Sequence, residues 1–153
     1  MIVCEVGLNH LGDVQMVSQY IEKACQSNLD AVTFQVREDQ FYEGPRHHHL
    51  LLPDSVYAEA QRNLKQYGKK TGYAVAEICR VDALAELGAD FFKILSWDIT
   101  NELLIQRMLK TDVELIFVST GMSNFAEIEC FADIVKGQEK RIRLIHTQLS
   151  MDI

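Results

Sequence analysis

Short apolar runs alternate along the chain with longer segments of mixed character. The apolar runs have the length of buried strands and cover residues 2–8, 30–36, 72–78, 90–95, 113–118 and 141–147. Apolar side chains between them recur every three or four positions, which predicts helices over residues 14–27, 54–70, 81–87, 101–109 and 124–135. This alternation predicts an α/β fold of parallel strands joined by helical crossovers. The pattern alone fits both an open doubly wound sheet and a barrel.

Polar residues and glycines mark the ends of these segments. Residues able to cap a helix N-terminus are Asp13, Asp54 or Ser55, Thr100 or Asn101, and Ser123 or Asn124. Gly88 follows the third predicted helix as a stop residue. Residues 37–53 are polar and contain Gly44-Pro45, so we expect a long loop there. No break marks a second domain, and we expect one domain over 1–153.

Composition and charge narrow the function classes. Of 153 residues, 48% are hydrophobic, and the formal net charge is −7. An acidic chain lacks the basic face that a sequence-independent nucleic-acid binder needs, although local lysines can still hold a small anion. No apolar run approaches the ~20 residues of a membrane span, and the N-terminus has no basic region of a signal peptide.

Cysteine and histidine patterns give no metal site. The four cysteines, Cys4, Cys25, Cys79 and Cys130, are scattered within apolar patterns and form no CxxC pair. We therefore expect buried free thiols in a reducing cytoplasm. Adjacent side chains rarely point to one ion, so we expect His47–His49 to lie in a solvated loop rather than at a metal.

Four polar blocks stand where predicted strands end. They are residues 5–10, 34–35, 92–96 and 119–123. A (β/α) barrel carries its chemistry at the C-terminal ends of its strands. The blocks therefore favour an incomplete barrel of about six strands over the open sheet.

The blocks resemble the sialic acid synthase family, which includes N-acetylneuraminate synthases and their legionaminate and spore-coat relatives. The matching stretches are Glu-Val-Gly-Leu-Asn-His-Leu-Gly at 5–12, Asp-Ala-Val-Thr-Phe-Gln at 30–35, Leu-Gly-Ala-Asp-Phe-Phe-Lys-Ile-Leu-Ser at 87–96, Asp-Ile-Thr-Asn at 98–101 and Ser-Thr-Gly-Met-Ser at 119–123. Five blocks in one order, across almost the whole chain, are much more specific than any single one.

The resemblance implies a barrel enzyme that condenses phosphoenolpyruvate with N-acetylmannosamine or a related amino sugar. It also implies Mn²⁺ or Mg²⁺, whose histidine ligands in the family lie on the seventh and eighth strands. No metal ligand is therefore expected in this chain. The C-terminal strands and the antifreeze-like domain of many members are also missing from this sequence, so we expect a partial barrel that forms a homo-oligomer.

Candidate substrate-binding residues follow from the blocks. Lys93 ends an apolar strand, where a buried lysine needs an anionic partner, and in the family this lysine contacts phosphoenolpyruvate. Ser96 and Ser119 could donate hydrogen bonds to phosphate or carboxylate oxygens, while Gly121 would allow a close backbone approach. Thr147 is carried over from the end of the sixth strand. A snorkelling or ion-paired lysine is the structural alternative for Lys93.

The N-terminal block supplies the candidate catalytic residues. Glu5 falls in a strand expected to be buried, and either a catalytic or a salt-bridge role stays open for it. His10 is a candidate for orienting substrate or transferring a proton, with a loop-fixing hydrogen bond as its alternative. Asn9 and Gln35 are candidate substrate contacts. For Ser123 we expect helix capping rather than ligand binding.

Two departures from the family weaken the catalytic hypothesis. Thr33 stands where the family has a second phosphate-binding lysine, and Arg37 is a possible substitute. Residues 76–80, Ala-Glu-Ile-Cys-Arg, replace the Ser-Thr-Pro-Phe-Asp run of the family.

Three explanations for this sequence stay open: a fragment of a longer protein, a chain completed by a partner, or a degenerate relative. The rival function is a non-catalytic module that retains an anion pocket, and a further alternative is another phosphoenolpyruvate-using or aldolase-type barrel.

Overall fold

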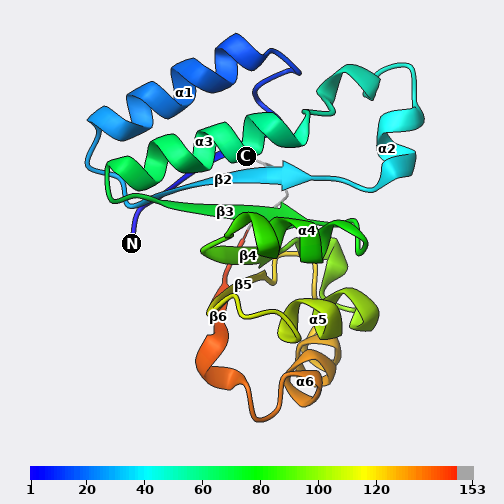
Figure 1. Ribbon diagram of the computed structural model, residues 1–153. Helices are drawn as coiled ribbons and strands as arrows, with labels where there is room; N and C mark the ends of the chain where they lie inside the picture. Colours follow the sequence, from blue (N-terminus) through cyan, green and yellow to red (C-terminus); the bar gives the residue numbers. More distant parts are fainter. Residues whose placement is uncertain (148–153) are drawn as a thin grey trace, which may run out of the picture. The chain divides into compact units, whose positions relative to one another are not determined.

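The computed structural model describes residues 1–147, in which six strands alternate with helices and stand in sequence order in the sheet (Figure 1). The strands are β1 (Val3–Gly7), β2 (Ala31–Val36), β3 (Lys70–Val75), β4 (Phe91–Ile94), β5 (Leu115–Ser119) and β6 (Ile142–Ile145). The helices are α1 (Val14–Gln26), α2 (Asp39–Glu43), α3 (Asp54–Gln66), α4 (Arg80–Leu87), α5 (Glu102–Leu109) and α6 (Phe125–Ile134). Three 3-10 turns are η1 (His48–Leu50), η2 (Ser96–Asp98) and η3 (Glu139–Arg141).

The predicted α/β alternation is confirmed. The pairs β1–β2, β4–β5 and β5–β6 are all parallel. Parallel neighbours need a crossover, and the helices between successive strands supply it. No helix within residues 1–147 is long and apolar enough to cross a membrane. The chain folds as two compact units, Met1–Ala74 and a second that begins at Val75, and each is described by itself.

An aromatic cluster holds the first unit together. Helices α1 and α3 pack side by side and bury apolar stripes on their facing sides (Figure 1). Beneath them Phe34 of β2, Tyr57 of α3 and Tyr73 of β3 are all almost completely buried. The ring centroids of Phe34 and Tyr57 lie 5.5 Å apart in an edge-to-face arrangement, and those of Tyr57 and Tyr73 lie 5.7 Å apart. Such ring pairs add stability beyond their buried area.

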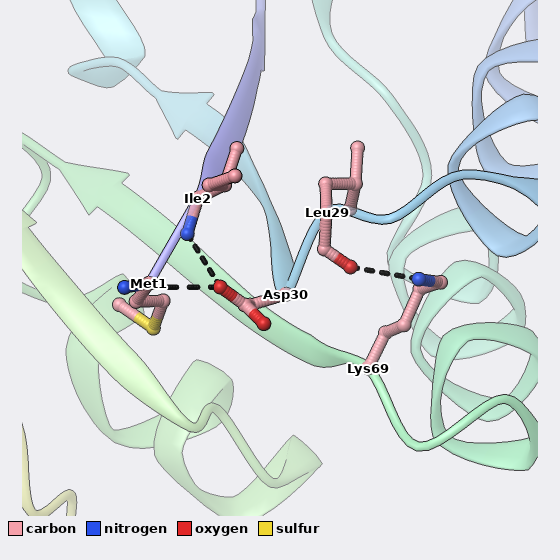
Figure 2. Close-up of polar contacts among 5 residues, drawn as sticks. All are labelled: Met1, Ile2, Leu29, Asp30 and Lys69. Carbon is pink, nitrogen blue, oxygen red and sulfur yellow. Dashed lines mark hydrogen bonds and ion pairs between the residues drawn. The ribbon is translucent and has the colours of Figure 1, made fainter.

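A polar clamp fixes the N-terminal ends of the strands in this unit. Asp30 accepts a hydrogen bond from the Ile2 N–H at 2.5 Å and pairs with the Met1 ammonium at 3.8 Å (Figure 2). Lys69 donates from Nζ to the carbonyl oxygens of Ser27 and Leu29 at 2.8 and 2.7 Å. Asp30 therefore stabilises strand register at the end of β2 opposite Gln35.

In the second unit, the Arg141 side chain fixes the turn that leads into β5. Its guanidinium donates to the backbone carbonyls of Leu109, Thr111 and Val113 at 2.7, 2.9 and 2.5 Å. These carbonyls belong to the end of α5 and to the turn that leads into β5. A planar group with five donors can satisfy several carbonyls that a helix end leaves without partners. The sequence pattern did not single out this residue.

Replacing Arg141 by lysine should destabilise the protein by about 2 kcal/mol, because a point-like ammonium cannot reach all three carbonyls. The matched control is Arg143→Lys, since exposed Arg143 bonds, among the described residues, only the nearby carbonyls of Lys140 and Ile142. Urea unfolding of both variants measures the difference. Equal losses in the two variants would contradict the assignment.

The long loop predicted over residues 37–53 was wrong in part. Helix α2 and the turn η1 form within it, because three side chains there find apolar cover: Tyr42, Leu50 and Leu52 are buried. The prediction for His47–His49 also needs correction. His48 and His49 are exposed as expected, but the His47 ring stacks on Phe41 at 4.2 Å, nearly parallel.

Two predicted boundaries also differ. Pro53, not Asp54 or Ser55, precedes α3 at the N-cap and makes no side-chain capping bond, so Asp54 is the first helical residue. Strand β3 ends at Val75 rather than at residue 78, because Glu77 turns the chain toward α4. Its backbone carbonyl accepts from Arg80 N at 3.1 Å and its carboxylate accepts from Cys79 N at 3.3 Å.

The four cysteines are free thiols, as predicted, but they are not fully buried. Cys79 and Cys130 are exposed, and Cys4 and Cys25 are half-buried. Apolar residues occur all around α6, and yet only Phe131 of this helix is buried. The apolar pattern therefore gave a wrong prediction of burial for Cys130. Partial burial raises the pKa of the Cys25 thiol.

Candidate functional site

Strands β1 and β2 end side by side and bring Gln35 to the first block. Glu5 pairs in register with Thr33 and Gly7 with Phe34, with an irregularity between Glu5 and Gly7. Gly7 has φ +55°, and a Cβ added there would lie 3.9 Å from Gln35 Oε1. The amide of Gln35 therefore lies beside the turn that leaves β1. Residues of these two blocks therefore lie next to each other at the ends of β1 and β2.

Glu5 does not lie in the environment expected for it. Its side chain is exposed, and in β1 only Val6 is buried. The argument that burial of a carboxylate would be costly at this position therefore does not apply, since the side chain is exposed. The reason is local: one residue of a period-two strand faces the helices, and Glu5 faces the other way. Its catalytic role stays a prediction.

The loop after β1 folds on itself through tight turns. Asn9 donates from its backbone N–H and from Nδ2 to the Val6 carbonyl, both at 2.9 Å. His10 is completely buried, and its Nδ1 accepts a hydrogen bond from the Gly12 N–H at 3.0 Å. Burial lowers the pKa of His10, which favours the neutral ring. Its Nε2 has no hydrogen-bond partner within residues 1–147.

Gly12 allows the η1 segment to approach this loop. Its φ is +77°, and a Cβ built there would lie 1.7 Å from the His49 carbonyl oxygen. Leu11, which precedes it, also has a positive φ of 50°. Only a glycine combines that backbone conformation with such a close carbonyl. Asp13 then caps α1 as predicted, accepting from Gln15 N at 2.7 Å.

Substituting Gly12 by alanine should cost about 1–3 kcal/mol more than the backbone strain alone, because the new methyl group overlaps a main-chain oxygen. Gly68→Ala is the matched control: its φ is +68°, but no atom lies within 4 Å of the added Cβ. We expect about 1 kcal/mol for the control from left-handed strain. Thermal denaturation compares the two, and a Gly12 variant as stable as the control would exclude the close contact.

In the second unit, Lys93 and Ser119 lie on one side of the sheet. Lys93 on β4 is paired in register with Phe117 on β5, and Ser119 follows Phe117 by two residues. Residues two apart on a strand point to the same face. Only 9% of Lys93 is exposed and Ser119 is buried, with no hydrogen-bond partner for its Oγ within residues 1–147. An ammonium and a hydroxyl on one buried face can bind an anion.

The Thr147 hydroxyl joins three strand ends. Its Oγ1 accepts from the Gly121 N–H at 2.9 Å and lies 3.0 Å from Ser96 Oγ. A Cβ on Gly121 would overlap the Thr147 carbonyl oxygen, so the missing side chain of Gly121 allows close approach of Thr147, and the approach of a ligand there stays a prediction. Thr120 adds a hydrogen bond to the Ile145 carbonyl at 3.0 Å. Ser96 and Thr147 therefore meet, although their sequence positions gave no sign of this contact.

Replacing Thr147 by valine should destabilise the protein by about 1–3 kcal/mol, because the Gly121 N–H loses its acceptor while the side-chain shape is kept. Thr147→Ser retains the hydroxyl and is expected to lose less than half as much. Chemical denaturation measures both variants. Equal free energies of unfolding for the valine and serine variants would show that the hydrogen bond from the Gly121 N–H to the Thr147 hydroxyl does not stabilise the protein.

The predicted capping role of Ser123 was wrong. Asn124 is the N-cap of α6: its side chain accepts from Glu127 N at 3.0 Å, and Glu127 accepts from Asn124 N at 2.9 Å. This reciprocal pair is a capping box, which the Asn-x-x-Glu spacing permits. Ser123 Oγ is left buried without a hydrogen-bond partner in the described part of the chain.

Arg37 contacts two nearby residues of the first unit, Glu38 and Phe41. Its Nε pairs with Glu38 at 2.9 Å, and its Cζ lies 4.3 Å from the Phe41 ring centroid. His47 stacks on the same ring, so Phe41 contacts both Arg37 and His47. Thr33, which stands where the family has a lysine, is buried and brings no positive charge.

Comparison with known proteins places the chain in a family. The sequence model of the NeuB family matches residues 20–150. N,N'-diacetyllegionaminic acid synthase of Campylobacter jejuni is 30% identical, covering 95% of this chain and 50% of the relative. Human N-acetylneuraminate-9-phosphate synthase is 25% identical, covering 88% of this chain and 43% of the relative. The chain thus spans half or less of the length of these relatives.

The fold agrees with solved structures. The N-acetylneuraminic acid (sialic acid) synthetase of Leptospira borgpetersenii, solved in complex with citrate, superposes with a TM-score of 0.87. The superposition covers 99% of this chain and 55% of that one at 22% identity, which shows the shared TIM-barrel-like fold of alternating strands and helices. Because the family sequence model matches most of its length, the chain belongs to the NeuB family.

Proposed function

We propose that this chain carries the phosphoenolpyruvate-binding part of a synthase that condenses phosphoenolpyruvate with N-acetylmannosamine or a related amino sugar. The observation that carries the proposal is Lys93, a nearly buried cation on the same face as the Ser119 hydroxyl, which has no hydrogen-bond partner among residues 1–147. The names of the relatives, which are legionaminic acid and N-acetylneuraminate-9-phosphate synthases, support the sugar class. Both substrates are small molecules.

The proposed reaction has a simple balance of bonds. The C3 carbon of phosphoenolpyruvate attacks the sugar aldehyde carbon, forming the new C–C bond while the aldehyde oxygen gains a proton. Water then adds to C2, and the C2–O bond to phosphate breaks as a keto group forms. The substrate carries a carboxylate and a phosphate throughout, so its site needs cations and donors. Lys93 and Ser119 would supply them, and Ser96, whose hydroxyl lies 3.0 Å from Thr147 Oγ1, is proposed as a further donor.

For the first unit, taken by itself, Gln35 and Asn9 stay the proposed substrate contacts. Gln35 presents its amide beside Gly7, and Asn9 stands in the following loop. Glu5 is exposed to solvent, so it is the better candidate for proton transfer than buried His10.

A divalent metal ion, Mn²⁺ or Mg²⁺, would supply Lewis-acid chemistry at the aldehyde when bound. The residues do not fit such a site: within residues 1–147, neither unit by itself gathers three His, Cys, Asp or Glu ligand atoms. We therefore assign no metal ligand to this chain and no step to the metal.

A non-catalytic anion-binding module is the second candidate function. It is favoured by Thr33, which is buried and uncharged where the family has a lysine, and by Arg37, which pairs with Glu38 instead. Such a module would keep the pocket around Lys93 and lack turnover.

Two further points are part of the proposal. Four free thiols support a reducing, cytoplasmic location. Large exposed apolar side chains, Leu103 and Phe125, support a homo-oligomer.

Lys93→Gln should weaken phosphoenolpyruvate binding by about 10- to 100-fold, because it removes a charge-assisted hydrogen bond of about 1.5–3 kcal/mol. Lys65→Gln, at an exposed position on α3, is the control and should bind normally. Isothermal titration calorimetry measures the affinity.

A phosphate-release assay with N-acetylmannosamine and Mn²⁺ then separates the two candidates. Binding with release supports the synthase, and binding without release supports the module. Equal affinity in both lysine variants would refute the pocket.

A further inference from the structure

The hydrogen bonds of the His10 ring define which nitrogen carries the proton. A backbone N–H can only donate, so Nδ1, which accepts from Gly12 N at 3.0 Å, must present a lone pair. In a neutral imidazole the proton then resides on Nε2. The lowered pKa of the buried ring agrees with the neutral form.

The loop holds this arrangement firmly. Leu11 and Gly12 both have positive φ, which turns the Gly12 N–H back toward the ring. The Asp13 N–H donates to the His10 carbonyl at 2.8 Å, closing the turn. The tautomer is thus determined by the main chain and not by a neighbouring charge.

The other ring nitrogen is a buried donor with nothing to bind. His10 is 0% exposed, and Nε2 has no hydrogen-bond partner within residues 1–147. Buried donors are almost always paired, and an exception needs an explanation such as a missing ligand. A donor with fixed direction recognises an oxygen acceptor.

We propose that His10 Nε2–H is a fixed hydrogen-bond donor to an oxygen atom of the bound substrate. This rests on the proposed function and changes the role of one residue within it. With Nδ1 already accepting and Nε2 already protonated, the ring has no free position for a proton. His10 therefore binds and orients a carboxylate, phosphate or carbonyl oxygen, and it does not act as a base.

The tautomer can be tested without any substrate. Long-range ¹H–¹⁵N NMR correlation of the His10 ring in the full chain at neutral pH should show protonated Nε2 and unprotonated Nδ1. A ring protonated on Nδ1, or on both nitrogens, would overturn the proposal whatever the chain binds.

Two variants separate the ring's contacts. His10→Asn places an acceptor near the Nδ1 position and removes the Nε2 donor. His10→Gln places an amide donor near the Nε2 position and removes the loop acceptor. We expect His10→Asn to keep most of the thermal stability and lose about 10-fold in affinity, whereas His10→Gln loses stability and keeps affinity closer to that of the unmodified chain.

Calorimetry with phosphoenolpyruvate alone and with N-acetylmannosamine alone shows which substrate supplies the oxygen. If His10→Asn loses affinity for only one of the two compounds, that compound supplies the oxygen. Unchanged affinity for both in His10→Asn, with Lys93→Gln still impaired, overturns the donor role and leaves the proposed function intact. If the unmodified chain binds neither compound, the proposed function fails together with the ligand half of this inference.

Discussion

Parallel strand pairing is the constraint on which the arrangement of polar residues depends. Because neighbouring strands run in the same direction, their carboxyl ends meet at one edge, and side chains far apart in sequence become neighbours. In the second unit this pairing sets Phe117 beside Lys93 and Ile145 beside Ser119, and Thr147 follows Ile145 by two residues. In the first unit it sets Gln35 beside Gly7. The hydrophobic pattern that forms the strands therefore also assembles the polar groups.

Much of this fold could be predicted because its local signals agree with one another. Helix α1 shows a regular apolar stripe, an aspartate cap at Asp13 and no internal glycine, and its observed limits follow. Gly88 ends α4 in the left-handed conformation that its position after the helix suggested. Where the signals were weak, as over residues 37–53, the outcome was set by burial of Tyr42, Leu50 and Leu52, which no periodicity reveals.

The polar residues were harder to interpret than the elements that carry them. The serines and threonines of the blocks have the same chemical groups and yet differ in use. Ser96 and Thr147 bond each other and the main chain, whereas the hydroxyls of Ser119 and Ser123 have no hydrogen-bond partner among the described residues. Sequence spacing could not distinguish them, because the contact of Thr147 with Gly121 joins residues that are 26 positions apart. The same holds for Arg141, whose carbonyl partners lie about thirty residues upstream.

The clamp around Asp30 has a consequence for how such a chain can change over time. In the first unit, register is held at one end of the strands by Asp30 and Lys69 (Figure 2). Gln35 and the His10 loop occupy the other end. Strand β2, six residues long, separates the two sets of contacts. Substitutions at the polar end can accumulate without loosening the anchor, since distant sites combine additively. The first unit can therefore change its ligand preference through such substitutions while the contacts that stabilise its fold are retained.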